Sequence, residues 1–132
     1  MMNNKIALDT TAYTAFGMDN ANVVTLVSEA TSVSLPIIVL GEIYYGIFNG
    51  SLKHKNRSAL SGFLSNPRVE MLNIDEMTAK IFGEISTELK KIGRPVQQND
   101  IWIAALCKQY GYALATADKG FTNISGLEVI NF

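Results

Sequence analysis

The fold of this chain is decided by one stretch, Gln98-Asn99-Asp100-Ile101-Trp102-Ile103-Ala104-Ala105-Leu106-Cys107. It predicts a helix that begins at Asn99, because asparagine is a preferred N-cap residue and Pro95 lies just upstream. Gly111 is well suited to end this helix. Asp100 therefore falls in the first turn, where backbone N–H groups have no partner within the helix.

Asp100 shares one face of this helix with apolar side chains, which on helical spacing are Ile103, Ala104 and Cys107. We expect that face to be buried. A carboxylate at the head of an apolar stripe has two interpretations: it caps the helix and interacts with its dipole, or it is a functional acid. The choice depends on which residues from the rest of the chain lie nearby.

Length and composition indicate one globular domain, spanning residues 1–132, with too few charged residues for disorder. The net charge of −1 excludes nucleic-acid binding through overall charge, although a local basic patch could still bind it. A single cysteine, Cys107, excludes an internal disulfide and fits a reducing cytoplasm, where we expect the protein. Residues 1–5 are too short for the apolar part of a secretory leader, and no apolar run could span a bilayer, so we expect no membrane partner.

Short apolar runs alternate with segments of helical periodicity along the chain. The predicted strands are residues 5–8, 32–35, 69–74, 113–117 and 127–130, and helices are expected after residues 9, 20, 36, 52, 75 and 99. This alternation predicts an α/β fold, a three-layer α/β/α sandwich around a mostly parallel sheet of roughly four or five strands.

Four acids from distant parts of the chain fall at one edge of this predicted sheet. Asp9 and Asp118 end two strands, and Asp100 and Glu42 lie near the starts of two helices. In an open α/β sheet, ligands bind outside the carboxyl ends of the strands, so the four could converge there. Glu42 is the only charge in the apolar segment 37–48. The alternative to a functional role is a glutamate held by a buried hydrogen bond, for instance to a tyrosine.

Converging carboxylates need a compensating cation. All-oxygen ligands without nearby His or Cys favour Mg²⁺ or Mn²⁺ over Zn²⁺. Thr10 and Thr116 lie next to these acids in sequence and could orient a carboxylate or a water. Since Mg²⁺ commonly takes phosphate oxygens as further ligands, the pattern predicts hydrolysis of phosphodiester bonds by metal-activated water.

Four blocks of the chain together resemble the PIN-domain family and, within it, the VapC toxins of bacterial toxin–antitoxin pairs. The blocks are Ile6-Ala7-Leu8-Asp9-Thr10, Leu40-Gly41-Glu42-Ile43-Tyr44-Tyr45-Gly46, Asn99-Asp100-Ile101-Trp102-Ile103-Ala104-Ala105 and Ala115-Thr116-Ala117-Asp118-Lys119-Gly120-Phe121. The order and spacing match from end to end. Where many relatives have Arg or Asn between the Thr and Asp of the last block, this chain has Ala117.

The resemblance implies a Mg²⁺-dependent endoribonuclease in which Asp9, Glu42, Asp100 and Asp118 bind the metal. It also implies that Thr116 and Asn99 support these acids. The expected partners are an RNA substrate, in several relatives a transfer RNA, a cognate antitoxin protein and a second copy of the chain in a homodimer.

Three features leave alternatives open. The basic residues Lys53, Lys55 and Arg57 are either an ordinary solvated helix face or contacts for RNA phosphates. The aromatic residues 44, 45 and 48 are either core or an exposed surface for a partner. The fold could also serve as a non-catalytic, metal-binding interaction module, or the nuclease could act on DNA.

Overall fold

The computed structural model describes residues 4–132, and within them five strands form one parallel sheet. In chain order the strands are β1 (Lys5–Leu8), β2 (Ser32–Pro36), β3 (Val69–Leu72), β4 (Ala113–Thr116) and β5 (Val129–Asn131). They lie side by side in the order β3-β2-β1-β4-β5. Residues 1–3, where the sequence predicts no leader, lie outside the described part.

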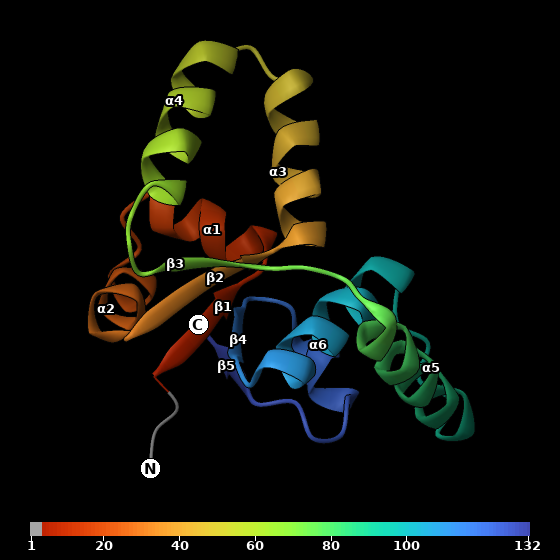
Figure 1. Cartoon of the computed structure of the whole chain (residues 1–132). Helices are drawn as coiled ribbons and strands as arrows, with labels where there is room; N and C mark the ends of the chain where they lie inside the picture. Colours follow the sequence, from red (N-terminus) through yellow and green to blue (C-terminus); the bar gives the residue numbers. More distant parts are fainter. Residues whose placement is uncertain (1–3) are drawn as a thin grey trace.

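Six α-helices and one short 3-10 helix connect these strands in residues 4–132. They are α1 (Thr10–Gly17), α2 (Ala21–Glu29), α3 (Ile37–Phe48), α4 (Lys53–Leu64), α5 (Glu76–Lys91), α6 (Gln98–Tyr110) and η1 (Lys119–Asn123). Helices α1, α2 and α4 lie on one side of the sheet and α5 and α6 on the other (Figure 1). The predicted α/β/α sandwich is therefore confirmed.

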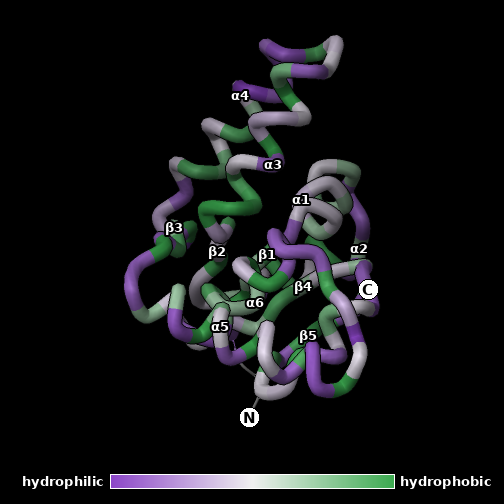
Figure 2. The backbone as a smooth tube through the Cα atoms, turned by 90° about the vertical axis from the view of Figure 1, so that its right-hand side faces the viewer, coloured by the Kyte–Doolittle hydropathy of each residue, from purple (hydrophilic) through white to green (hydrophobic). Residues whose placement is uncertain are grey.

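Helices α3 and α4 form a hairpin that projects from the sheet (Figure 1). The hydrophilic start of α4 lies at its tip (Figure 2). The base of the hairpin contacts α1, and α3 also contacts α6. Glu42 on α3 is thereby brought toward the carboxyl edge of the sheet.

The chain reverses direction across the sheet at the junction of β1 and β4. From β1 it moves outward through β2 to β3, and it then crosses back to β4 on the other side of β1. The register pairs Leu8 with Ala115, so both strands end at the same level. Such a switch point opens a crevice beyond the strand ends, and Asp9 and Asp118 follow these two strands.

Several predicted boundaries and faces were wrong. Helix α6 begins at Gln98 with Gln97 as N-cap, so Asn99 does not cap it. The last strand begins at Val129 because Gly126 adopts a left-handed φ of 78° and the Leu127 N–H bonds back to the Ile124 carbonyl. Met77 is 51% exposed, although its helical spacing from Ile81 and Ile85 on α5 predicts that it shares their apolar face.

Other predicted features of these helices are confirmed. Gly111 ends α6 in the left-handed conformation, with φ of 75°. Ile103, Ala104 and Cys107 are fully or almost fully buried, and burial raises the pKa of the Cys107 thiol well above its usual range. Cys107 is therefore a core residue. Among residues 4–132, no helix has the length and apolar character needed to cross a bilayer.

Candidate active site

Asp9 is held at the carboxyl end of β1 by its role as N-cap of α1. Its Oδ1 accepts a hydrogen bond from the Ala12 N–H at 2.9 Å, which satisfies one of the free donors of the first turn. The side chain is only 5% exposed. Burial of a carboxylate without water is costly unless each oxygen finds partners.

Two threonine hydroxyls supply further partners for Asp9. Thr116, the buried last residue of β4, donates to Asp9 Oδ2, and Thr11 donates to Asp9 Oδ1 at 2.6 Å. Both hydroxyls also accept from the turn after β4, Thr116 from the Asp118 N–H at 2.9 Å and Thr11 from the Ala117 N–H at 3.0 Å. Two threonine hydroxyls thus connect the Asp9 carboxylate to the turn that carries Asp118.

Glu42 is half-buried on α3 and held by two polar side chains. Thr10 donates to its Oε1 at 2.7 Å, and the amide of Asn99 approaches its Oε2 at 3.5 Å. Because α6 begins before Asn99, this amide is free to reach across to α3 instead of capping its own helix. The stronger of these two bonds therefore comes from a threonine and not from a tyrosine.

Asp118 is the most exposed of the four acids and is the N-cap of η1. Its Oδ1 accepts from the Gly120 N–H at 2.8 Å, which fixes one oxygen toward its own turn. A Cβ at position 120 would lie 3.1 Å from that oxygen, so glycine lets the turn close tightly. Asp118 therefore presents its carboxylate at the rim of the crevice.

The pKa of Asp100 responds to the charges of the other three acids. Burial, and after it the negative charges of Asp118, Glu42 and Asp9 in that order, together raise the pKa of Asp100 from 3.8 to about 6. A helix N-terminus would normally lower the pKa of a carboxyl in the first turn. The opposite shift means that neighbouring carboxylates and burial dominate, and it favours the functional interpretation of this residue over simple capping.

The donor set suits a hard divalent cation. All four acids offer oxygen ligands, and the concentrated negative charge disfavours ionisation of Asp100 unless a cation offsets it. As the side chains stand, no three acid, His or Cys groups of residues 4–132 lie close enough to hold one ion together.

A groove of about 490 Å³ adjoins Glu42 between α1, α3 and α4. Thr10 and Glu42 line its end at the acids, and Lys55 lies on the wall contributed by α4. Tyr13 also lines it, and burial raises the pKa of that phenol. The groove thus reaches one of the four acids, Glu42.

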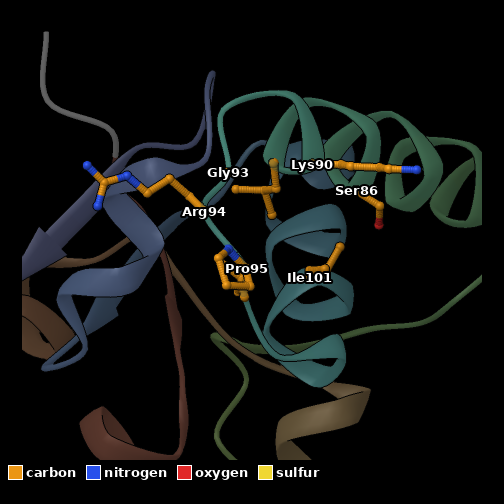
Figure 3. A pocket seen from close by; sticks show the side chains of 8 residues that line it. Ser86, Lys90, Gly93, Arg94, Pro95 and Ile101 are labelled. Carbon is orange, nitrogen blue, oxygen red and sulfur yellow. The ribbon is translucent and has the colours of Figure 1, made fainter.

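The pocket in Figure 3 is a separate feature without acids. It has a volume of about 360 Å³ and lies between the end of α5 and the start of α6. The charged ends of Lys90 and Arg94 extend away from it on opposite sides (Figure 3). Its lining includes the Ser86 hydroxyl but no carboxylate, histidine or cysteine.

The basic residues of α4 are exposed. Lys53, His54, Lys55 and Arg57 all lie in the first turns of α4, and of these only Lys55 lines the groove beside Glu42. The expected solvated helix face is therefore present. Whether it contacts RNA phosphates stays a prediction.

Sequence reasoning missed Thr11. It considered Thr10 and Thr116, because they adjoin acids in the sequence. The hydroxyl of Thr11, two residues after Asp9, also contacts the Asp9 carboxylate. A usable signal was present, since a threonine two residues after an N-cap aspartate can bond back to it.

Comparisons with known proteins identify relatives across nearly the whole chain. The PIN-domain family model matches residues 6–127. The Ribonuclease VapC2 of Rickettsia felis is 30% identical over 112 residues, which cover 84% of this chain and 82% of the relative. The tRNA(fMet)-specific endonuclease VapC of Shigella flexneri is 31% identical over 91 residues, covering 68% and 67% of the two chains.

A solved structure agrees with these matches. The crystal structure of VapBC2 from Rickettsia felis, bound to a DNA fragment from their promoter, superposes with a TM-score of 0.85 at 27% identity. The match covers 97% of this chain and 98% of that chain.

Proposed function

Because this chain belongs to the PIN-domain family and its VapC ribonuclease group, we propose that it is a Mg²⁺-dependent endoribonuclease, the toxin of a toxin–antitoxin pair. The observation that carries the proposal is the raised pKa of Asp100, to which Asp9, Glu42 and Asp118 all contribute. This raised pKa supports a common location of the four acids at the crevice beyond β1 and β4. The names of the relatives support RNA as the substrate class.

In this proposal the four carboxylates hold Mg²⁺, and Mn²⁺ is the nearest substitute. When bound, the metal would neutralise charge on the phosphodiester and make a water molecule more acidic. The chain supplies the orientation. Thr116 and Thr11 fix Asp9, and Thr10 and Asn99 fix Glu42.

The residues around the acids support an extended substrate. The groove reaches Glu42, and Lys55 on its wall could bind a phosphate. We propose that Lys53 and Arg57, exposed on the same helix, add further phosphate contacts. A transfer RNA is the first substrate to test, since the Shigella flexneri relative is named for one.

Two protein partners belong to the same proposal. A cognate antitoxin is supported by the VapBC2 structure that this fold matches. A homodimer is supported by exposed aromatic side chains on α3, Tyr45 at 72% and Phe48 at 55%. A cytoplasmic location belongs to the same proposal and is supported by the single cysteine, Cys107, which fits a reducing compartment.

The deciding experiment is cleavage of total cellular RNA by the purified, antitoxin-free chain. We expect discrete fragments with Mg²⁺, and no fragments with chelator or with the Asp100→Asn variant. Asp19→Asn is the matched control, because Asp19 is exposed and its left-handed φ of 58° accepts asparagine. Cleavage by Asp100→Asn at the wild-type rate would remove Asp100 from the mechanism.

Two other outcomes would point elsewhere. Cleavage of matched DNA but not RNA oligonucleotides would change the substrate class. Binding of Mg²⁺ without cleavage of either polymer would instead favour the non-catalytic interaction module.

A further inference from the structure

The two threonines that contact Asp9 are equivalent in their hydrogen bonding. Each hydroxyl donates its single proton to one oxygen of Asp9 and accepts one backbone N–H of the turn that carries Asp118. Thr116 lies at the end of β4, within the sheet, where its burial is expected. Thr11 is an exposed residue on the first turn of α1, so burial does not explain why its hydroxyl makes both hydrogen bonds.

The hydrogen bonds leave Asp9 with one defined free direction. An ionised carboxylate has roughly four acceptor sites, two on each oxygen. Oδ1 uses both of its sites, for Thr11 and the Ala12 N–H, and Oδ2 uses one for Thr116. The remaining site is on Oδ2. If Thr11 were removed, Oδ1 would also have a free site and the carboxylate could rotate toward it.

We propose that Thr11 is a positioning residue of the metal site, which holds the Asp9 carboxylate so that Oδ2 is the oxygen offered to the cation. Through the Ala117 N–H, the same hydroxyl also sets the distance between Asp9 and the turn of Asp118. The inference rests on the proposed metal-binding role of these acids. It adds a residue from α1 to the groups that determine metal affinity.

A purely structural role would have a different consequence. A hydroxyl that only tied α1 to the turn after β4 would affect stability and local opening, but not the affinity for a cation. Hydrogen bonds to ligating carboxylates, by contrast, typically change metal affinity or activity by about 10–100-fold when removed. Metal affinity therefore separates the two roles.

The test is Mn²⁺ titration of the purified chain, followed by the electron paramagnetic resonance of the free ion, without RNA. Thr11→Val removes the hydroxyl and keeps the shape, and we expect Mn²⁺ affinity to fall roughly ten-fold or more. Thr11→Ser restores the hydroxyl and should recover most of the affinity. The matched control is Thr25→Val, an exposed threonine on α2 away from the acids, which should bind as the wild type does.

A second measurement uses hydrogen exchange at the Ala117 amide. Thr11→Val should speed its exchange, because the amide loses its acceptor. Faster exchange with wild-type Mn²⁺ affinity would overturn the proposal and leave Thr11 a structural tie. If Thr11→Val does not fold, Thr11→Ala removes the same hydroxyl and takes its place.

The outcomes also separate this inference from the proposed function. A wild-type chain that binds Mn²⁺ but cuts no RNA would contradict the nuclease proposal, while the titration still tests Thr11. A wild-type chain that binds no Mn²⁺ would overturn the role of Thr11. Wild-type affinity in Thr11→Val together with RNA cleavage would overturn this inference alone.

Discussion

Asp100 makes the stability of the metal-free protein depend on pH. Its pKa is about 6 in the folded chain and about 3.8 when unfolded, so the folded state holds the proton more tightly. Stability therefore falls as pH rises from about 3.8 through about 6, and the cost of ionisation is complete above that range. Asp100→Asn cannot ionise and avoids this cost.

We therefore expect Asp100→Asn to be more stable than the wild type at pH 7.5 in chelator, by about 1 kcal/mol after allowing for partial solvent screening. The difference should vanish near pH 4. Urea unfolding at both pH values measures it. Added Mg²⁺ should stabilise the wild type more than the variant, and a variant less stable than the wild type at pH 7.5 would contradict the assigned convergence of charges.

A different prediction concerns the stability of Thr116 variants, because the hydroxyl of Thr116 is fully buried. Thr116→Val would leave Asp9 Oδ2 and the Asp118 N–H without their partner. Unsatisfied buried groups cost about 1–3 kcal/mol, so the free energy of unfolding should fall by that amount. Thr116→Ser should lose much less, and equal losses for both variants would show that the methyl group matters more than the hydroxyl.

At the scale of helices and strands, the starts of elements were harder to predict than their existence. Asn99 has the properties of an N-cap, yet α6 begins one residue earlier and Asn99 points to Glu42. Instead of capping the helix, the side chain of Asn99 contacts Glu42, which is 57 positions away in the sequence. Such long-range competition cannot be read from the stretch around Asn99.

Helix α4 carries the basic residues whose role the fold does not decide. If Lys53, Lys55 and Arg57 contact phosphates, replacing all three with alanine should weaken RNA binding. It should also reduce the slope of log affinity against log salt by about 2, as expected for three lost contacts with single-stranded RNA. Filter binding at several salt concentrations measures both quantities.

A charge-matched control comes from α5. Lys80, Lys90 and Lys91 are also exposed, and they lie on the other side of the sheet from α4. Replacing these three with alanine removes the same charge and should leave the salt slope nearly unchanged. Equal losses from both triple variants would mean that only overall charge matters, and that α4 has no special role.

At the scale of the whole molecule, the approach of Asp9 to the turn of Asp118 was predictable because it follows from topology. Asp9 and Asp118 end strands that parallel pairing places side by side, whatever the loops between them do. The hydrogen bonds that orient the acids were not predictable in the same way. Thr11 acts through Ala117, and no pattern within either segment signals a contact between residues 106 positions apart.

The exposed aromatic residues of α3 lead to the prediction of a homodimer. Tyr45 and Phe48 are three residues apart and so lie on one side of the helix, and Leu52 just beyond it is 55% exposed. Exposed aromatic residues commonly supply most of the energy at protein interfaces. We expect the antitoxin-free chain to dimerise, and Tyr45→Ser with Phe48→Ser to weaken the dimer roughly 30-fold or more.

Sedimentation equilibrium over a range of concentrations tests this, with Met77→Ser and Ile92→Ser as the control pair. Those two apolar side chains are comparably exposed, at 51% and 57%, but Met77 lies on α5 and Ile92 is the C-cap of that helix. Their replacement should leave the dimer intact, because we expect dimerisation to depend on the α3 side chains and not on the total exposed apolar surface. A wild-type chain that stays monomeric at every concentration would contradict the homodimer and leave the α3 surface to a different protein, for which the cognate antitoxin is the candidate.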